Sequence, residues 1–112
     1  MRFKKTDAGY LDNNTGLIWK EQDEPKKLNY KEALKLTNST WCLPTVSELL
    51  SIVDYTKDSP ATSLPGILMS FYGSATPDNC YETDAWGVNF RFSYSYTSNK
   101  REGHYIRLIL RE

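Results

Sequence analysis

The sequence predicts an α+β fold. Two short stretches in the first half have the apolar spacing of helices, whereas the last third alternates apolar and polar residues as strands do. Between them, residues 56–84 show no periodicity. The chain has 112 residues, enough to bury one hydrophobic core, so we expect a single domain over residues 1–112. We expect two helices packed on a twisted antiparallel sheet, with a long irregular loop region on one side.

The first twenty residues predict short strands separated by turns. Residues 2–4 open a strand, and a dense run of turn-forming residues at 12–16 precedes a short apolar strand at 17–19. We expect Trp19 to be a structural residue. The run Asp12-Asn13-Asn14 also resembles the start of a calcium loop, but the bidentate glutamate of such loops is missing at the required later position. We therefore interpret this run as a turn.

The first helix follows an exposed connector. Residues 21–28 are charged and contain a proline. Asn29 can serve as an N-cap, and Glu32 lies three residues later, where its carboxylate can complete a capping box. Apolar residues then recur at helical spacing, so we expect a helix over about residues 30–38.

The stretch 41–50 predicts an entry into the core followed by a sharply started helix. Pro44 favours an extended conformation in the residue before it, so the strand-like beginning ends there. Thr45 and Glu48 have the spacing of a second capping box, and the helix should end near residues 54–55. Three residues of this stretch are expected in the core: Trp41, Leu43 and Leu49.

Residues 56–84 are expected to form an ordered loop region, because repeated Pro and Gly residues interrupt the chain while its apolar residues still have to pack. The remainder predicts an antiparallel hairpin with one apolar face. Residues 86–97 form its first strand, residues 98–100 turn, and residues 105–110 return. Arg91, Tyr105 and Arg107 belong to the polar face in this prediction, and Tyr94 and Tyr96 fit either face.

Composition excludes several classes of function. Fourteen basic and fourteen acidic residues cancel, which argues against a general nucleic-acid binder and against attraction to anionic membranes. No apolar run approaches the roughly 20 residues of a membrane span. The basic start lacks a following apolar segment, so no signal peptide is visible. As written, the chain is expected to be cytoplasmic, or extracellular if it is a domain cut from an exported parent.

The sequence contains no pattern that indicates catalysis, a cofactor or a metal site. Cys42 and Cys80 form either one long-range disulfide or two buried thiols, and we favour thiols. With His104 as the single histidine, they cannot supply a zinc site. A nucleophilic pair of Cys42 and His104 is disfavoured because Cys42 lies in the predicted core entry. We expect a protein that is not an enzyme.

Five motifs occur in a fixed order along nearly the whole chain. They are Arg2-Phe3, residues 12–19 (DNNTGLIW), residues 41–49 (WCLPTVSEL), residues 85–90 (AWGVNF) and residues 106–109 (IRLI). In this order the chain resembles the Lcl C-terminal domain family, a domain of unknown function. The resemblance implies a C-type-lectin-like fold and, by analogy with the wider fold group, the binding of carbohydrates or proteins.

The chain departs from the family pattern at three places. Cys42 stands where the family usually has an arginine, and residues 72–76 lack its usual tryptophan. Leu110 replaces the second arginine of the closing strand. The sequence signatures of calcium-dependent sugar lectins are also missing.

We therefore expect a non-enzymatic binding module that recognises another macromolecule, most of all a protein, because the chain is short and neutral and lacks calcium motifs and an export signal. A phage or mobile-element product that inhibits a host protein would fit. One alternative is a glycan- or glycosaminoglycan-binding adhesion module of an exported protein. Another is an enzyme of the formylglycine-generating type, which would need a reactive cysteine pair or a metal.

Aromatic residues make up 13% of the chain and suggest where binding occurs, because tyrosine-rich surfaces are frequent in binding sites. The candidate surface combines the long loop region with the polar face of the final hairpin. Its residues are Tyr72, Tyr81, Trp86, Arg91, Tyr94, Tyr96 and Arg107. For Trp86 we favour a structural role between the loop region and the sheet.

Overall fold

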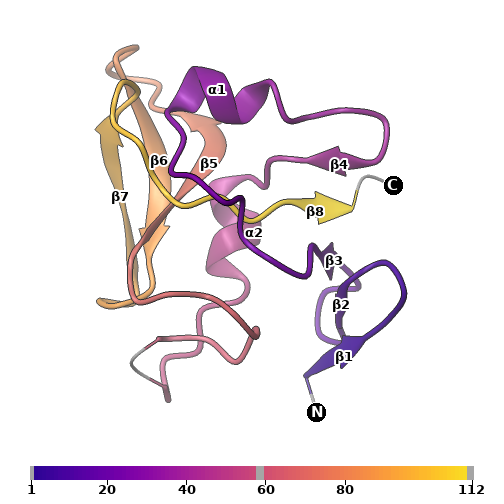
Figure 1. Ribbon diagram of the computed structural model, residues 1–112. Coiled ribbons are helices and arrows are strands. Elements are labelled where there is room, and N and C mark those ends of the chain that lie inside the picture. Colours follow the sequence, from indigo (N-terminus) through magenta and orange to yellow (C-terminus); the bar gives the residue numbers. More distant parts are fainter. Residues whose placement is uncertain (1, 58–59, 111–112) are drawn as a thin grey trace.

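The computed structural model describes residues 2–57 and 60–110, which form an α+β domain with two short helices and two antiparallel sheets (Figure 1). In chain order the elements are β1 (Phe3–Lys5), β2 (Tyr10–Asp12), β3 (Ile18–Trp19), α1 (Tyr30–Leu34), β4 (Trp41–Cys42), α2 (Val46–Leu50), β5 (Phe71–Pro77), β6 (Asp84–Asn89), β7 (Tyr94–Asn99) and β8 (Ile109–Leu110). None of the helices in the described residues is long and apolar enough to cross a membrane.

The first sheet has five strands in the order β1-β2-β3-β8-β4. Its first three strands come from the N-terminal segment: β1 and β3 confirm the strands predicted at residues 2–4 and 17–19, and β2 is an additional strand between them. Trp19 pairs with Tyr10 on one side and with Ile109 on the other, so the C-terminal strand β8 lies beside the N-terminal strands. The two ends of the described chain thus meet in one sheet.

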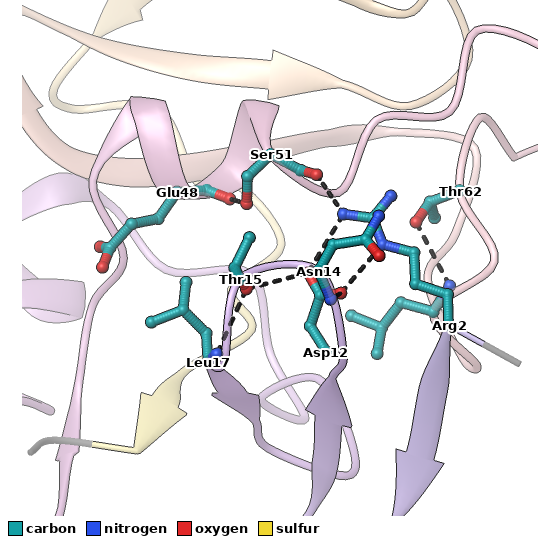
Figure 2. Close-up of polar contacts among 9 residues, drawn as sticks. Arg2, Asp12, Asn14, Thr15, Leu17, Glu48, Ser51 and Thr62 are labelled. Atoms are coloured by element: carbon teal, nitrogen blue, oxygen red, sulfur yellow. Dashed lines mark hydrogen bonds and ion pairs between the residues drawn. The ribbon is translucent and has the colours of Figure 1, made fainter.

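The turn after β2 is built around the buried carboxylate of Asp12 (Figure 2). Its oxygens accept hydrogen bonds from the backbone N–H of Asn14 and from Thr15 Oγ1, each at 3.0 Å, and form an ion pair with Arg2. Arg2 also donates to the carbonyl of Ser51, which follows α2. Burial by itself would raise the pKa of Asp12, but these hydrogen bonds and the charge of Arg2 together lower it. The predicted turn is confirmed and is tied to α2.

Both predicted capping boxes are confirmed. Asn29 and Glu32 exchange their reciprocal hydrogen bonds at the start of α1, and Thr45 and Glu48 do so at the start of α2. Both helices are shorter than predicted. After α2, Ile52 N–H bonds to the carbonyl three residues earlier rather than four, which tightens the chain out of α-helical geometry.

The second sheet has three strands in the order β5-β6-β7, and it corrects two predictions. Residues 71–77 form β5, although the sequence predicts them as part of the irregular region. Residues 86–97 do not form one strand that pairs with residues 105–110. The chain reverses between Asn89 and Tyr94, and β7 pairs with β6.

The physical reason for this reversal is the side chain of Asn89. Its Oδ1 accepts hydrogen bonds from the backbone N–H groups of Arg91, at 2.8 Å, and Phe92, at 3.3 Å. Ser93 completes the turn with a φ of 63°, in the left-handed region. An asparagine turn inside an alternating pattern is easily missed, because Phe90 and Phe92 keep the period of a strand through it.

Residues 104–110 connect the two sheets. Tyr105 forms a parallel bridge with Tyr72 of β5, and its carbonyl accepts from Gly73 N–H. The same segment exchanges backbone hydrogen bonds with the connector at Leu28 and then enters the first sheet as β8. Figure 1 shows this yellow segment running from the second sheet toward the N-terminal strands.

Two clusters of buried apolar side chains form the core. The larger one lies between α2, the loop after it and the inner side of the second sheet; it contains Trp19, Leu49, Ile52, Leu64, Ile67, Val88 and Phe90. The smaller one contains Ala33, Leu43, Ile106 and Leu108, with Trp41 packed at its edge. Trp19, Leu43 and Leu49 are confirmed as core residues, whereas Trp41 is half-buried. In the described part of the loop region, Leu64 and Ile67 are buried, whereas Leu68 and Met69 are exposed.

Candidate functional site

Five rings form a continuous row across the second sheet, which we call the aromatic row: Phe92, Tyr94, Tyr96, Phe71 and His104. Ring centroids lie 6.0 Å apart between Phe92 and Tyr94 and 5.4 Å apart between Tyr94 and Tyr96. The row continues from Tyr96 to Phe71 at 4.6 Å and from Phe71 to His104 at 4.5 Å. These separations are those of interacting aromatic pairs.

The strand register explains why the rings gather. Tyr94 and Tyr96 are two residues apart on β7, so their side chains share one face of the sheet. Tyr96 lies opposite Gly87 of β6. A Cβ atom on Gly87 would lie 2.3 Å from Cζ of Phe71, so the ring of Phe71 occupies the space of the missing side chain. The glycine lets Phe71 reach across the central strand to Tyr96.

One end of the aromatic row is open to solvent. Phe92 is 54% exposed and Tyr94 is 51% exposed, so two neighbouring rings of the row face solvent. The guanidinium of Arg91 lies 5.3 Å from the centroid of the Phe92 ring and adds a positive charge to this end. Asn89 holds the middle ring of the row, because its Nδ2 donates to Tyr96 Oη at 3.0 Å.

The other end of the row is partly buried at His104. Its Nε2 lies 3.0 Å from Ser98 Oγ, and that hydroxyl also donates to Glu102 Oε2 at 3.0 Å. Because the hydroxyl proton of Ser98 is used on Glu102, the imidazole Nε2 is the donor in its contact with Ser98. Burial lowers the pKa of His104; the nearby Glu102 raises it and Lys27 lowers it further, both by smaller amounts.

A small cavity lies beside His104, between the start of α1 and one end of the second sheet. The residues that line it include Leu28, Asn29, Ala33, Trp86 and Lys100. Among residues 2–57 and 60–110, no three His, Cys, Asp or Glu side chains gather closely enough to hold a metal ion. The aromatic row itself offers ring faces for stacking and the hydroxyl groups of Tyr94 and Tyr96 for hydrogen bonding.

The structure brings three of the predicted site residues together: Arg91, Tyr94 and Tyr96. Tyr81 is exposed in the turn between β5 and β6, at the opposite end of the sheet from Tyr94. Trp86 is half-buried on the central strand and lines the cavity.

The expected placement of Arg107 on a polar surface is wrong. Its side chain is 1% exposed, and Tyr72 is 0% exposed. Arg107 Nε donates to Asp23 Oδ1 at 2.7 Å, and Tyr72 Oη donates to the other oxygen of the same carboxylate. Burial and the hydrogen bond to Asp23 raise the pKa of Tyr72, which keeps the phenol protonated.

This buried cluster ties two irregular segments to the core. Nη1 of Arg107 donates to the carbonyls of Lys20, at 3.0 Å, and Pro65, at 3.1 Å. Tyr72 Oη also accepts from Leu68 N–H at 3.0 Å. Arg107 and Tyr72 thereby fix the charged connector and the loop before β5. Their role is to stabilise the fold.

Sequence reasoning missed Phe71, Phe92 and His104 as members of the row. Phe92 has the period of a buried strand residue, but it stands in the turn that Asn89 creates. For Phe71 the available signal was weak: two glycines, Gly73 and Gly87, that pair across the strands and leave room for a ring. His104 comes close only through the path of residues 104–110.

Neither cysteine belongs to the aromatic row. Cys80 is an exposed free thiol, so no disulfide joins it to Cys42, which is half-buried on β4. The preference for thiols is confirmed, whereas the expectation that both are buried is wrong for Cys80. His104 contacts Phe71 and Ser98, and Cys42 lies in the other sheet.

A family model described as the Lcl C-terminal domain matches residues 9–110. Searches among curated proteins and among solved structures found no match.

Proposed function

The chain belongs to the Lcl C-terminal domain family, and from this premise we propose that it is a non-enzymatic binding module that recognises another protein through the aromatic row. The family is one of unknown function, so the proposal depends on the chemistry of the row itself.

The observation that carries the proposal is the pair of half-exposed rings, Phe92 and Tyr94, beside Arg91. Aromatic residues and arginine are the types enriched at the centres of protein interfaces, where their removal costs most. Rings held in a row by neighbouring rings also lose little conformational freedom when a partner covers them. A phage or mobile-element product that inhibits a host protein is one setting for such a module.

A second candidate is the binding of glycans, and the same rings favour it, because the flat faces of exposed tyrosines can stack on sugar rings. Sulfated glycans would in addition need a basic surface, and the formal net charge of the chain is zero. We therefore rank a protein partner first.

We also propose that the fold is C-type-lectin-like, as the family resemblance implies. Two short helices beside antiparallel sheets, a long irregular segment before β5, and terminal strands that meet in one sheet support this assignment. Superposition of an experimental structure on C-type-lectin-like domains tests this assignment. A strand order in the second sheet that differs from the order in those domains would contradict it.

The binding proposal is tested by panning a displayed library of protein fragments from the source organism against the full chain, in parallel with a glycan array. We expect fragments to be enriched, and Tyr94→Ala to weaken their binding at least tenfold, since a central interface ring is typically worth about 2 kcal/mol. Tyr55→Ala is the matched control, because Tyr55 is an exposed tyrosine outside the row.

Two outcomes would overturn the ranking. Enriched fragments that bind Tyr94→Ala and Tyr55→Ala equally well would place the interface elsewhere. Glycan retention that requires Tyr94, without any enriched fragment, would make the glycan-binding role the correct one.

A further inference from the structure

The side chain of Asn89 makes three hydrogen bonds at the aromatic row. It lies at the end of β6 and is only 8% exposed. Its Oδ1 accepts from the backbone N–H groups of Arg91, at 2.8 Å, and Phe92, at 3.3 Å. Its Nδ2 donates to Tyr96 Oη at 3.0 Å. One buried amide therefore fixes both the turn that carries Phe92 and the hydroxyl of the middle ring.

These partners leave the amide of Asn89 only one orientation. The two backbone N–H groups can only donate, so the amide atom that faces them is the oxygen. The reverse orientation would place the amide nitrogen against two donors. Nδ2 therefore faces Tyr96, and because this nitrogen can only donate, Tyr96 Oη is the acceptor in their contact.

The hydroxyl proton of Tyr96 consequently needs an acceptor other than Asn89. Among residues 2–57 and 60–110, the contact with Asn89 is the one hydrogen bond that Tyr96 Oη makes. A donor without a protein acceptor bonds to water or to a ligand. The ring of Tyr96 lies 5.4 Å from the half-exposed ring of Tyr94, so a partner that covers Tyr94 comes close to this hydroxyl.

The guanidinium of Arg91 adds further donors at the open end of the row. It lies 5.3 Å from the ring centroid of Phe92, and it forms no ion pair with an acid in the described part of the chain. A guanidinium carries N–H donors and no acceptor. The end at His104 differs, because the imidazole Nδ1 is an acceptor there when Nε2 donates to Ser98.

We propose that Tyr96 is a specificity-determining residue, which donates its hydroxyl proton to an oxygen acceptor of the protein partner. Asn89 is the positioning residue that fixes this direction. The acceptor is a backbone carbonyl or a carboxylate of the segment that covers Tyr94. A donor of the partner is disfavoured at this point, because Tyr96 Oη already accepts from Asn89. The inference rests on the proposed protein-binding function and specifies which chemical group the row selects.

The test selects displayed random peptides on the full chain and measures the dissociation constants of the enriched ones. Tyr96→Phe keeps the ring and removes the proton, so it should weaken binding about tenfold. Tyr81→Phe removes the hydroxyl of an exposed tyrosine outside the row and is the matched control, expected to bind within twofold. Asn89→Asp keeps an oxygen acceptor for the turn, but its carboxylate accepts the Tyr96 proton. This variant should therefore also weaken binding about tenfold.

A second variant leaves residue 89 unchanged, because Asn89→Asp also introduces a negative charge. A tyrosine fluorinated next to its hydroxyl, incorporated at position 96, is a stronger donor and a weaker acceptor. The chain that carries it should bind the peptides at least twofold more tightly. Replacing the acids of a peptide by their amides then distinguishes the two acceptors: a tenfold loss assigns a carboxylate, and unchanged binding assigns a backbone carbonyl.

The outcomes separate the inference from the proposed function. Weaker binding by the fluorinated chain would show that Tyr96 accepts from the partner and would overturn the inference. So would Asn89→Asp that binds as the parent chain does while Tyr96→Phe does not. If Tyr94→Ala weakens binding but Tyr96→Phe leaves it unchanged, the inference is wrong and the aromatic row remains the binding surface. If no peptide is enriched, or Tyr94→Ala has no effect, both are wrong.

Discussion

At the scale of single residues, Arg107 and Asp23 form the most deeply buried ion pair among the described residues, with side-chain exposures of 1% and 13%. Arg107 also donates to two backbone carbonyls, so it compensates several buried acceptors at once. Such a cluster stabilises the fold little relative to apolar packing, but removing one partner leaves the others unpaired in the interior.

We predict that Arg107→Ala lowers the free energy of unfolding by about 3–5 kcal/mol, because the carboxylate of Asp23 stays buried without its counter-charge. Urea denaturation measures this loss. The control is Lys5→Ala, which removes the exposed pair between Lys5 and Glu21 and should cost less than about 1 kcal/mol. If both variants lost the same free energy of unfolding, the buried cluster would contribute no more to stability than the exposed ion pair, and the prediction would be wrong.

The partly buried imidazole of His104 predicts that the free energy of unfolding depends on pH just below the ordinary pKa of histidine. His104 is the single histidine, and burial lowers its pKa in the folded state below the ordinary value of 6.5. Between the two pKa values the unfolded chain binds more protons than the folded one, so the free energy of unfolding rises with pH there. Stability is full above about pH 6.5 and falls as the pH drops through the folded-state pKa.

Urea denaturation at about pH 7.5 and about pH 5.5 tests this, with His104→Gln as the control that should remove most of the difference. Titration of the imidazole by NMR gives the folded-state pKa directly. A protein that is more stable at the lower pH would contradict the prediction.

At the scale of elements, the start of α2 illustrates which structural features can be predicted from residues that are close in the sequence. Thr45 Oγ1 accepts from Glu48 N–H at 3.2 Å, and Glu48 Oε1 accepts from Thr45 N–H at 2.8 Å. These contacts involve residues three apart, so the order of residue types alone indicates them. The end of α2 is not encoded in this way, because it depends on how the following loop packs.

We predict that Thr45→Ala destabilises the protein by about 1 kcal/mol, since the N–H of Glu48 loses its acceptor at the start of a helix of only five residues. Ser47→Ala, at an exposed position of the same helix, should change stability by no more than about 0.5 kcal/mol. Thermal unfolding monitored by circular dichroism compares the two. A larger effect at Ser47 than at Thr45 would contradict the role of the cap.

At the scale of the whole molecule, residues 104–110 couple the two sheets. They bond to β5 at Tyr105 and enter the five-stranded sheet as β8, and the larger core cluster includes side chains from both sheets. Neither sheet buries its apolar face without the other. We therefore expect one cooperative unit.

We predict that unfolding is two-state, so that far-UV and near-UV circular dichroism give coincident transitions in urea. Thr45→Ala, although it removes the cap of a helix, should lower amide-exchange protection in both sheets alike. Separate transitions, or a loss of protection confined to one sheet, would show that the sheets fold independently.

The sequence by itself determined the α+β class, the N-terminal strands and turn, both helix starts and the family, because each follows from residue types close together in the chain. It also identified Arg91, Tyr94 and Tyr96 as a candidate surface. Only the tertiary structure decided that Arg107 and Tyr72 are buried, because Asp23 comes to them from a distant connector. Likewise, the aromatic row exists because Gly87 leaves space for Phe71 and because β7, reversed by Asn89, pairs with β6 rather than with the C-terminal segment. Long-range contacts of this kind depend on packing in space, which local spacing does not encode.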